Sequence, residues 1–187
     1  MLVMMDFEQV LRAMLEAFER EHVRYGVLGG FALGVLKVPR TTVDLDLLVH
    51  RDDLMRLEGI VHRLGYLRRA RTENVTHYAH PDAAWGAIDI LHAFRAFSLA
   101  ILERAQRYPI FDGVLNVNVL QPEDVIGFKV QGMANNPLRA TKELVDIEAL
   151  MAYYGKTLDW ARIQEYFELF ELGEQGCQLH ERFGQAQ

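Results

Sequence analysis

Cysteine and long apolar runs are scarce in this 187-residue chain, and each scarcity excludes a class of protein. The single cysteine, Cys177, excludes an intrachain disulfide framework and any multi-cysteine zinc site. No apolar run approaches the roughly 18 residues of a membrane span. The start of the chain, Met1–Asp6, has neither the positive region nor the apolar stretch of a signal peptide. We therefore expect a cytoplasmic protein with no membrane partner.

Positive charge is also in deficit, because the formal net charge is −6. Residues 141–187 hold nine acidic and four basic residues, so most of the negative charge belongs to the end of the chain. This balance argues against broad, nonspecific binding of nucleic acid. One local basic cluster could contact a phosphate backbone or form an ordinary solvated face: Arg63, Arg68, Arg69 and Arg71.

The spacing of apolar residues predicts alternating helices and strands, followed by helices alone. We expect helices over 6–22, 31–36, 52–64, 95–106, 122–134, 139–154 and 158–171, and strands over 25–28, 42–49, 66–71, 75–80 and 87–91. A short hairpin is expected near 110–119, and a loose polar end after 171. This order predicts an α+β fold, with a mixed sheet flanked by helices over 1–120 and a small helical segment, 121–187, packed on it.

Two aspartates, Asp44 and Asp46, lie one residue apart in an apolar run that is typical of a strand. Side chains on a strand alternate between faces, so both carboxylates should emerge on one face while Val43, Leu45 and Leu47 turn into the core. Adjacent carboxylates repel each other unless a cation lies between them, and Mg²⁺ prefers carboxylate oxygens. The alternative is an ordinary pair of surface aspartates on a half-exposed strand.

Three segments taken in order resemble the DNA polymerase beta-like nucleotidyltransferase superfamily: Leu28–Ala32 with its Gly-Gly turn, Arg40–Asp46, and Ile88–Ile90 around a third aspartate. The similarity is closest to small prokaryotic members that include the abortive-infection (AbiEii-type) toxins. It covers roughly residues 20–150, including later segments at 121–129 and 142–147. The resemblance implies a nucleotidyltransferase-type sheet and transfer of a nucleoside monophosphate from an NTP to a hydroxyl acceptor.

The resemblance also assigns roles to the carboxylates. Asp44 and Asp46 would bridge two Mg²⁺ (or Mn²⁺) ions, and Asp89 would bind the ion on the acceptor side and orient or activate the acceptor hydroxyl. The acceptor would be a protein, a small molecule or an RNA end such as that of tRNA. Small members of the superfamily often belong to toxin–antitoxin or phage-defence loci, so a cognate antitoxin is an expected partner.

The nucleotide-binding residues implied by the resemblance lie before and after the aspartates. Backbone amides at Gly29 and Gly30 would face the β- and γ-phosphates, although a tight turn with positive φ explains the same glycines. Gly30 stands where many active members carry a serine whose hydroxyl contacts phosphate, so only backbone amides are available here. Arg40 could reach phosphate from the segment before the strand, or be a solvated charge.

Two lysines of the later helices complete the implied nucleotide site. Lys129 matches a position that contacts the triphosphate tail, and its alternative is an exposed helix lysine. Lys142 could face the cleft or pair with Asp146 one helical turn away. We favour a structural role for Asp146 and leave Lys142 open.

Two other interpretations use the same residues differently. A non-catalytic protein of the nucleotidyltransferase fold would bind nucleotide or a partner without transferring anything. A sugar-nucleotide glycosyltransferase could carry the paired aspartates, but the early Gly-Gly and the third aspartate fit it poorly. The seven histidines favour no metal site, since His77 and His80 should point to opposite faces of a strand. Aromatic residues of the last helices permit a homodimer.

Overall fold

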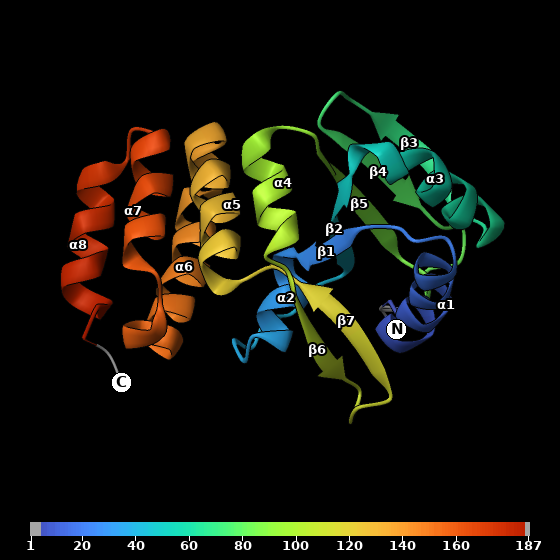
Figure 1. Ribbon diagram of the computed structural model, residues 1–187, viewed down its shortest axis with the longest axis horizontal. Helices are drawn as coiled ribbons and strands as arrows, with labels where there is room; N and C mark the ends of the chain where they lie inside the picture. Colours follow the sequence, from blue (N-terminus) through green and yellow to red (C-terminus); the bar gives the residue numbers. More distant parts are fainter. Residues whose placement is uncertain (1–4, 186–187) are drawn as a thin grey trace. The chain divides into compact units, whose positions relative to one another are not determined.

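The computed structural model describes residues 5–185, and the chain divides into two compact units (Figure 1). The first contains the described residues up to Ala32 and the segment Arg40–Leu120. The second contains Leu33–Pro39 and the described residues from Gln121 onward. The residues before Met5, on which the expectation about a signal peptide partly rests, lie outside the described residues. No helix within 5–185 is long and apolar enough to cross a membrane.

The first unit is built on a seven-stranded sheet of order β3-β4-β5-β2-β1-β7-β6. It pairs antiparallel at β1–β2, β3–β4, β4–β5 and β6–β7 and parallel at β2–β5 and β1–β7. The sheet is therefore mixed and flanked by helices, which confirms the predicted α+β class. Its elements are α1 (Phe7–Arg20), β1 (Tyr25–Leu28), β2 (Asp44–His50), a 3-10 turn (Arg51–Asp53), α3 (Leu54–Arg63), β3 (Leu67–Arg71), β4 (Val75–Ala79), β5 (Ala87–Ala93), α4 (Ala96–Glu103), β6 (Gln106–Ile110) and β7 (Leu115–Val119); α2 (Gly29–Val35) leads into the second unit.

The helix α1 covers one face of this sheet. It begins at Asp6, whose carboxylate accepts a hydrogen bond from the Gln9 amide at 3.0 Å, as the sequence predicts for an N-cap. Its buried face holds residues at helical spacing, and Phe18 packs on Tyr25 of β1 with ring centroids 5.0 Å apart. Tyr25 is in register with Val49 of β2, so this is the face of β2 that carries Leu45, Leu47 and Val49.

Strand alternation therefore separates the two sides of β2 as predicted. Leu45 and Leu47 are fully buried, whereas Asp44 and Asp46 are half-buried on the opposite face. The prediction is wrong for Val43, which is 59% exposed. Val43 lies one residue before the first residue of the strand, so the alternation does not yet apply to it.

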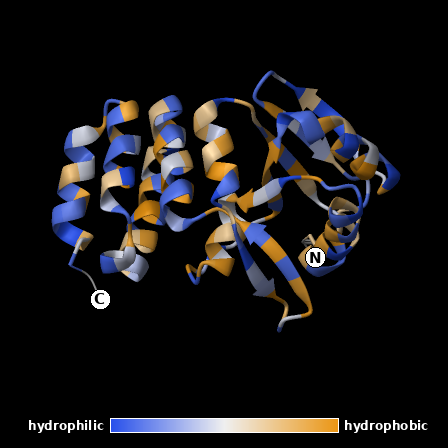
Figure 2. Cartoon of the chain, viewed as in Figure 1, coloured by the Kyte–Doolittle hydropathy of each residue, from blue (hydrophilic) through white to orange (hydrophobic). Residues whose placement is uncertain are grey.

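The second unit consists of helices: α5 (Pro122–Asn135), α6 (Ala140–Tyr154), α7 (Trp160–Leu169) and α8 (Gly173–Phe183), with 3-10 turns at Pro137–Arg139 and Gly155–Thr157. Residues buried among them include Ile147, Leu150 and Phe167. In Figure 2 these helices alternate between hydrophilic and hydrophobic colours along their length, as expected for helices with one buried face.

The sequence prediction is wrong about two stretches. The end after residue 171 was expected to be loose, but it forms α8, in which Gly176 and Leu179 are buried. A Cβ at Gly176 would lie 2.9 Å from the Cβ of Phe167, so close packing there depends on a glycine that hydropathy does not reveal. The hairpin is also longer than expected, because β6 begins at Gln106 and α4 already ends at Glu103.

Candidate nucleotide and metal site

The sheet brings the three predicted carboxylates onto one face of neighbouring strands. β2 and β5 run parallel, with Asp46 in register with Asp89 and Asp44 in register with Ala87. Asp44 lies two residues before Asp46, so all three side chains emerge on the same side. Each is half-buried. An open patch of three carboxylates therefore lies opposite the face that α1 covers.

A neighbouring side chain holds each of the two outer carboxylates. The hydroxyl of Thr42 donates a hydrogen bond to Oδ1 of Asp44 at 2.8 Å. His77 of β4, in register with Asp89, places Nδ1 2.7 Å from Oδ1 of that residue. Neither contact was predicted from the sequence. The His77 contact depends on the register between β4 and β5. The Thr42 contact joins residues only two positions apart, so the sequence already places these two side chains near each other.

The two glycines after β1 lie against the patch and its neighbour, Gly29 against Asp46 and Gly30 against Thr42. Gly29 has a φ of +70°, and a Cβ there would lie 1.9 Å from Oδ2 of Asp46. A Cβ at Gly30 would lie 2.6 Å from the Cβ of Thr42. Position 29 therefore requires glycine for its backbone conformation and for close approach. Arg40 is half-buried in the segment that leads into β2.

The donor set suits a hard divalent cation, but the side chains are not yet converged around one. No group of three His, Cys, Asp or Glu side chains within residues 5–185 is arranged to hold a metal ion. One oxygen of Asp44 and one of Asp89 are engaged by Thr42 and His77. Carboxylate oxygens on one open face are the ligands that Mg²⁺ prefers, so the residues fit an ion if their side chains turn toward it.

The two lysines predicted at the nucleotide lie in different surroundings within the second unit. Lys129 of α5 is buried, and its Nζ donates to Oε2 of Glu143 at 3.0 Å and to Oδ2 of Asp146 at 2.6 Å, both on α6. Burial, the largest single effect, raises the pKa of Glu143, but the hydrogen bond and charge of Lys129, together with the charges of Arg139 and Lys142, hold that pKa below its usual value. Lys142 is exposed. Asp146 thus binds Lys129, a partner that the sequence analysis did not name.

Most of the basic cluster is engaged in ion pairs. Arg68 and Arg71 of β3 lie 2.6 and 3.6 Å from the carboxylate of Glu58, and Arg63 pairs with Glu21. These two glutamates offset part of the positive charge of the four arginines that a phosphate backbone would meet.

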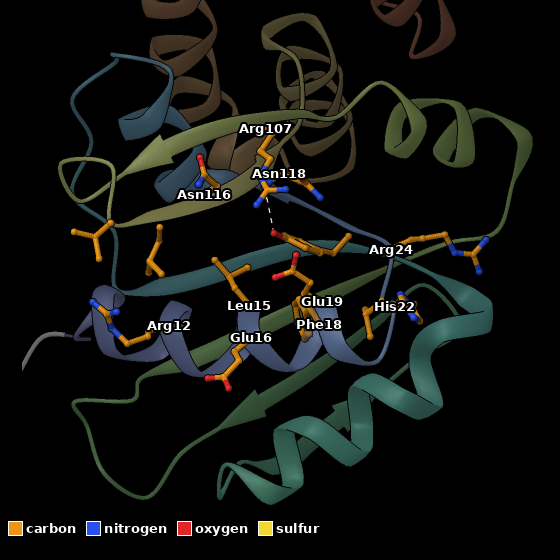
Figure 3. A pocket seen from close by; sticks show the side chains of 14 residues that line it. Arg12, Leu15, Glu16, Phe18, Glu19, His22, Arg24, Arg107, Asn116 and Asn118 are labelled. Atoms are coloured by element: carbon orange, nitrogen blue, oxygen red, sulfur yellow. Dashed lines mark hydrogen bonds between the residues drawn. The ribbon is translucent and has the colours of Figure 1, made fainter.

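A hollow of about 690 Å³ is lined by none of the three carboxylates. Its lining comes from α1, from residues 22–25 and from the β6–β7 hairpin (Figure 3). Tyr25 belongs to the face of the sheet opposite Asp46. His92 is buried on that same opposite face, where Thr76 and the Glu73 carbonyl bind its ring and burial lowers its pKa. Neither feature contributes to the carboxylate patch.

Comparisons with solved structures show the same fold in several nucleotidyltransferases. The solution structure of the antibiotic-resistance factor ANT(2'')-Ia is similar with a TM-score of 0.66 and 18% identity, over 95% of this chain and 99% of that one. The lincosamide antibiotic adenylyltransferase LnuA is similar with a TM-score of 0.55 and 16% identity, over 76% of this chain and 95% of that one. A nucleotidyltransferase-like structure from Thermotoga maritima is similar with a TM-score of 0.57 and 13% identity, over 76% of this chain and 96% of that one.

The sequence comparisons assign the family. No curated protein matches the chain significantly. The model of a family described as uncharacterised nucleotidyltransferases matches residues 5–179, which is nearly the whole chain. With its mixed sheet and the carboxylates of β2 and β5, the chain belongs to this family of nucleotidyltransferases and is an enzyme of that class.

Proposed function

We propose that this enzyme transfers a nucleoside monophosphate from an NTP to a hydroxyl acceptor with the help of two divalent ions, Mg²⁺ or Mn²⁺. The observation that carries the proposal is the placement of Asp44, Asp46 and Asp89 on one open face of β2 and β5. Nucleotidyltransferases of this kind generally use divalent metal ions. Three carboxylates on one face repel each other, and a bound cation removes that repulsion.

In this proposal Asp44, Asp46 and Asp89 hold the ions. Bound ions would stabilise negative charge on the attacking and departing oxygens. For Asp89 the proposal requires that one oxygen stay with His77 while the other faces the ion or the acceptor hydroxyl. The backbone at Gly29 lies close to Asp46, so a triphosphate bound along this turn would approach the same ions.

Three basic residues are proposed phosphate contacts with different support. Arg40 lies in the segment leading into β2, and Lys142 is exposed on α6. Lys129 would have to give up Glu143 or Asp146 to reach a phosphate, so its support is the weakest.

A small hydroxylated molecule is the acceptor class that we favour. One similar structure is ANT(2'')-Ia in complex with adenylyl-2''-tobramycin, and LnuA was solved with lincomycin bound. The ion pairs of Arg63, Arg68 and Arg71 leave less positive charge for RNA. A tRNA acceptor and a cognate antitoxin stay predictions from the resemblance, and a homodimer and a cytoplasmic location stay predictions from the sequence.

The test compares wild type with Asp46→Asn, and with Asp112→Asn as a control on the exposed β6–β7 turn. Each protein is incubated with Mg²⁺ or Mn²⁺, each of the four α-labelled NTPs, and an aminoglycoside, a lincosamide or total tRNA. We expect label transfer and pyrophosphate release from wild type and Asp112→Asn. Asp46→Asn should lose more than about 100-fold, because changes to residues that merely support metal ligands already cost about 10–100-fold.

Binding of Mn²⁺, followed by electron paramagnetic resonance on the same samples, separates the metal site from the choice of acceptor. Equal Mn²⁺ binding by wild type and Asp46→Asn would contradict the proposal, whatever acceptor was present. The alternative from the sequence is a non-catalytic protein that binds nucleotide or a partner and keeps Asp44 and Asp89 in their present hydrogen bonds. It predicts nucleotide binding that neither metal nor Asp46 affects.

A further inference from the structure

Thr42 lies where the turn after β1 meets the start of β2. Its hydroxyl donates to Oδ1 of Asp44 at 2.8 Å and lies 3.2 Å from the backbone oxygen of the same residue. Its Cβ lies 2.6 Å from where a Cβ at Gly30 would be, and its Oγ1 lies 2.7 Å from that point. Cβ atoms do not approach other atoms this closely, so the space between positions 30 and 42 has room for only one side chain, and that side chain is Thr42.

The contact fixes the direction of the Asp44 carboxylate. Every side-chain hydrogen bond of Asp44 within residues 5–185 comes from Thr42. Threonine is branched at Cβ and therefore stiff at χ1, and Gly30 packs closely against the Cβ and Oγ1. With Oδ1 held by the hydroxyl, Oδ2 is the oxygen left to bind a cation.

We propose that Thr42 is a positioning residue of the metal site, which holds Asp44 by its hydroxyl and is itself held in place by contact with Gly30. The inference rests on the proposed function, because a fixed carboxylate matters only where it binds an ion. Groups that hydrogen-bond a metal-ligating carboxylate keep it in the orientation that binding needs, and their removal typically lowers metal affinity or activity about 10–100-fold.

The first test removes the hydroxyl and keeps the shape. Thr42→Val should weaken Mn²⁺ binding about 10–100-fold, whereas Thr42→Ser should keep most of the affinity because it keeps the donor. Thr41→Val is the matched control, since Thr41 is exposed and adjacent; its Mn²⁺ affinity should equal that of wild type. The melting temperature of each variant is measured alongside, because a merely structural role would lower it without separating serine from valine.

The second test asks whether Thr42 acts through Asp44. In an Asp44→Asn background, Thr42→Val should cause little further loss of Mn²⁺ affinity, since the carboxylate that it positions is gone. Independent, additive losses would overturn the inference. So would a Thr42→Val protein that binds Mn²⁺ like wild type while Asp44→Asn does not, and that result would leave the proposed function intact. A wild type that binds no Mn²⁺ would overturn both proposals.

A third test uses the space shared with Gly30. Gly30→Ser places a Cβ 2.6 Å from that of Thr42, so Thr42 must move and Mn²⁺ affinity should fall as in Thr42→Val. Adding Thr42→Gly removes the competing Cβ and should raise the melting temperature above that of Gly30→Ser alone. A Gly30→Ser protein with wild-type stability and Mn²⁺ affinity would overturn the proposed packing.

Discussion

Replacing Lys129 with methionine distinguishes a structural from a nucleotide-binding role for this lysine. Its ammonium lies between Glu143 and Asp146, and all three side chains are at most 10% exposed. In Lys129→Met the side chain keeps its apolar length, but two buried carboxylates lose the ammonium that they share. Arg139, 2.7 Å from Glu143, stays as a second partner of that residue. Removing one partner of a buried ion pair costs about 3–5 kcal/mol, so we expect the free energy of unfolding to fall by about that amount.

Urea unfolding at pH 7 measures this loss. With a slope of about 2 kcal/mol per molar urea, the midpoint should fall by about 1.5–2.5 M. The matched control is Lys142→Met, which removes an exposed lysine of the same helical unit and should change stability by no more than about 0.5 kcal/mol. Mg²⁺-NTP binding is measured on both variants.

The pH dependence of the same loss tests its electrostatic origin. Burial raises the pKa of Glu143, but Lys129, together with the charges of Arg139 and Lys142, holds the folded-state pKa below 4.5. A carboxylate with a lowered pKa contributes stability above its unfolded-state pKa and loses it as the pH falls through the folded-state pKa. The difference between wild type and Lys129→Met should therefore be complete at pH 7 and shrink below about pH 4.5.

A loss of less than about 1 kcal/mol at pH 7 would refute this reasoning, because the predicted cost of removing the buried ammonium is at least three times larger. If the same variant also bound Mg²⁺-NTP much more weakly than wild type, the lysine would act at the nucleotide, as the resemblance implied. A large loss of stability with unchanged nucleotide affinity of the folded protein would assign it a structural role.

Two further predictions concern the first unit. Gly29→Ala should lower the melting temperature, because an alanine at a φ of +70° costs about 1–2 kcal/mol. It should also abolish Mn²⁺ binding, measured by titration, because the new Cβ would lie 1.9 Å from Oδ2 of Asp46. Burial raises the pKa of Asp53, but hydrogen bonds from Arg24 outweigh it and hold the pKa below 3.8, so its stabilisation is present above that pH and lost below. Asp53→Asn should cost about 1–3 kcal/mol at pH 7 and progressively less below pH 4 in urea unfolding; an equal cost at both pH values would contradict this.

The fold was predictable wherever a local pattern decides the structure. The apolar spacing and the Asp6 cap predict α1, and the short apolar run Tyr25–Leu28 is β1. The α8 helix was missed because part of its packing comes from Gly176, whose lack of a side chain lets it lie against Phe167. Close approach of this kind depends on a partner nine residues away and leaves no hydropathy signal.

For the candidate site, the sequence predicts which carboxylates share a face but not what holds them. Alternation along β2 depends on that strand alone, so the shared face of Asp44 and Asp46 follows from the sequence. The contact between His77 and Asp89 depends on the register between β4 and β5, and a shift of one residue would turn His77 to the other face. The carboxylates therefore identify the chemistry, whereas their orientation depends on neighbours that tertiary pairing selects.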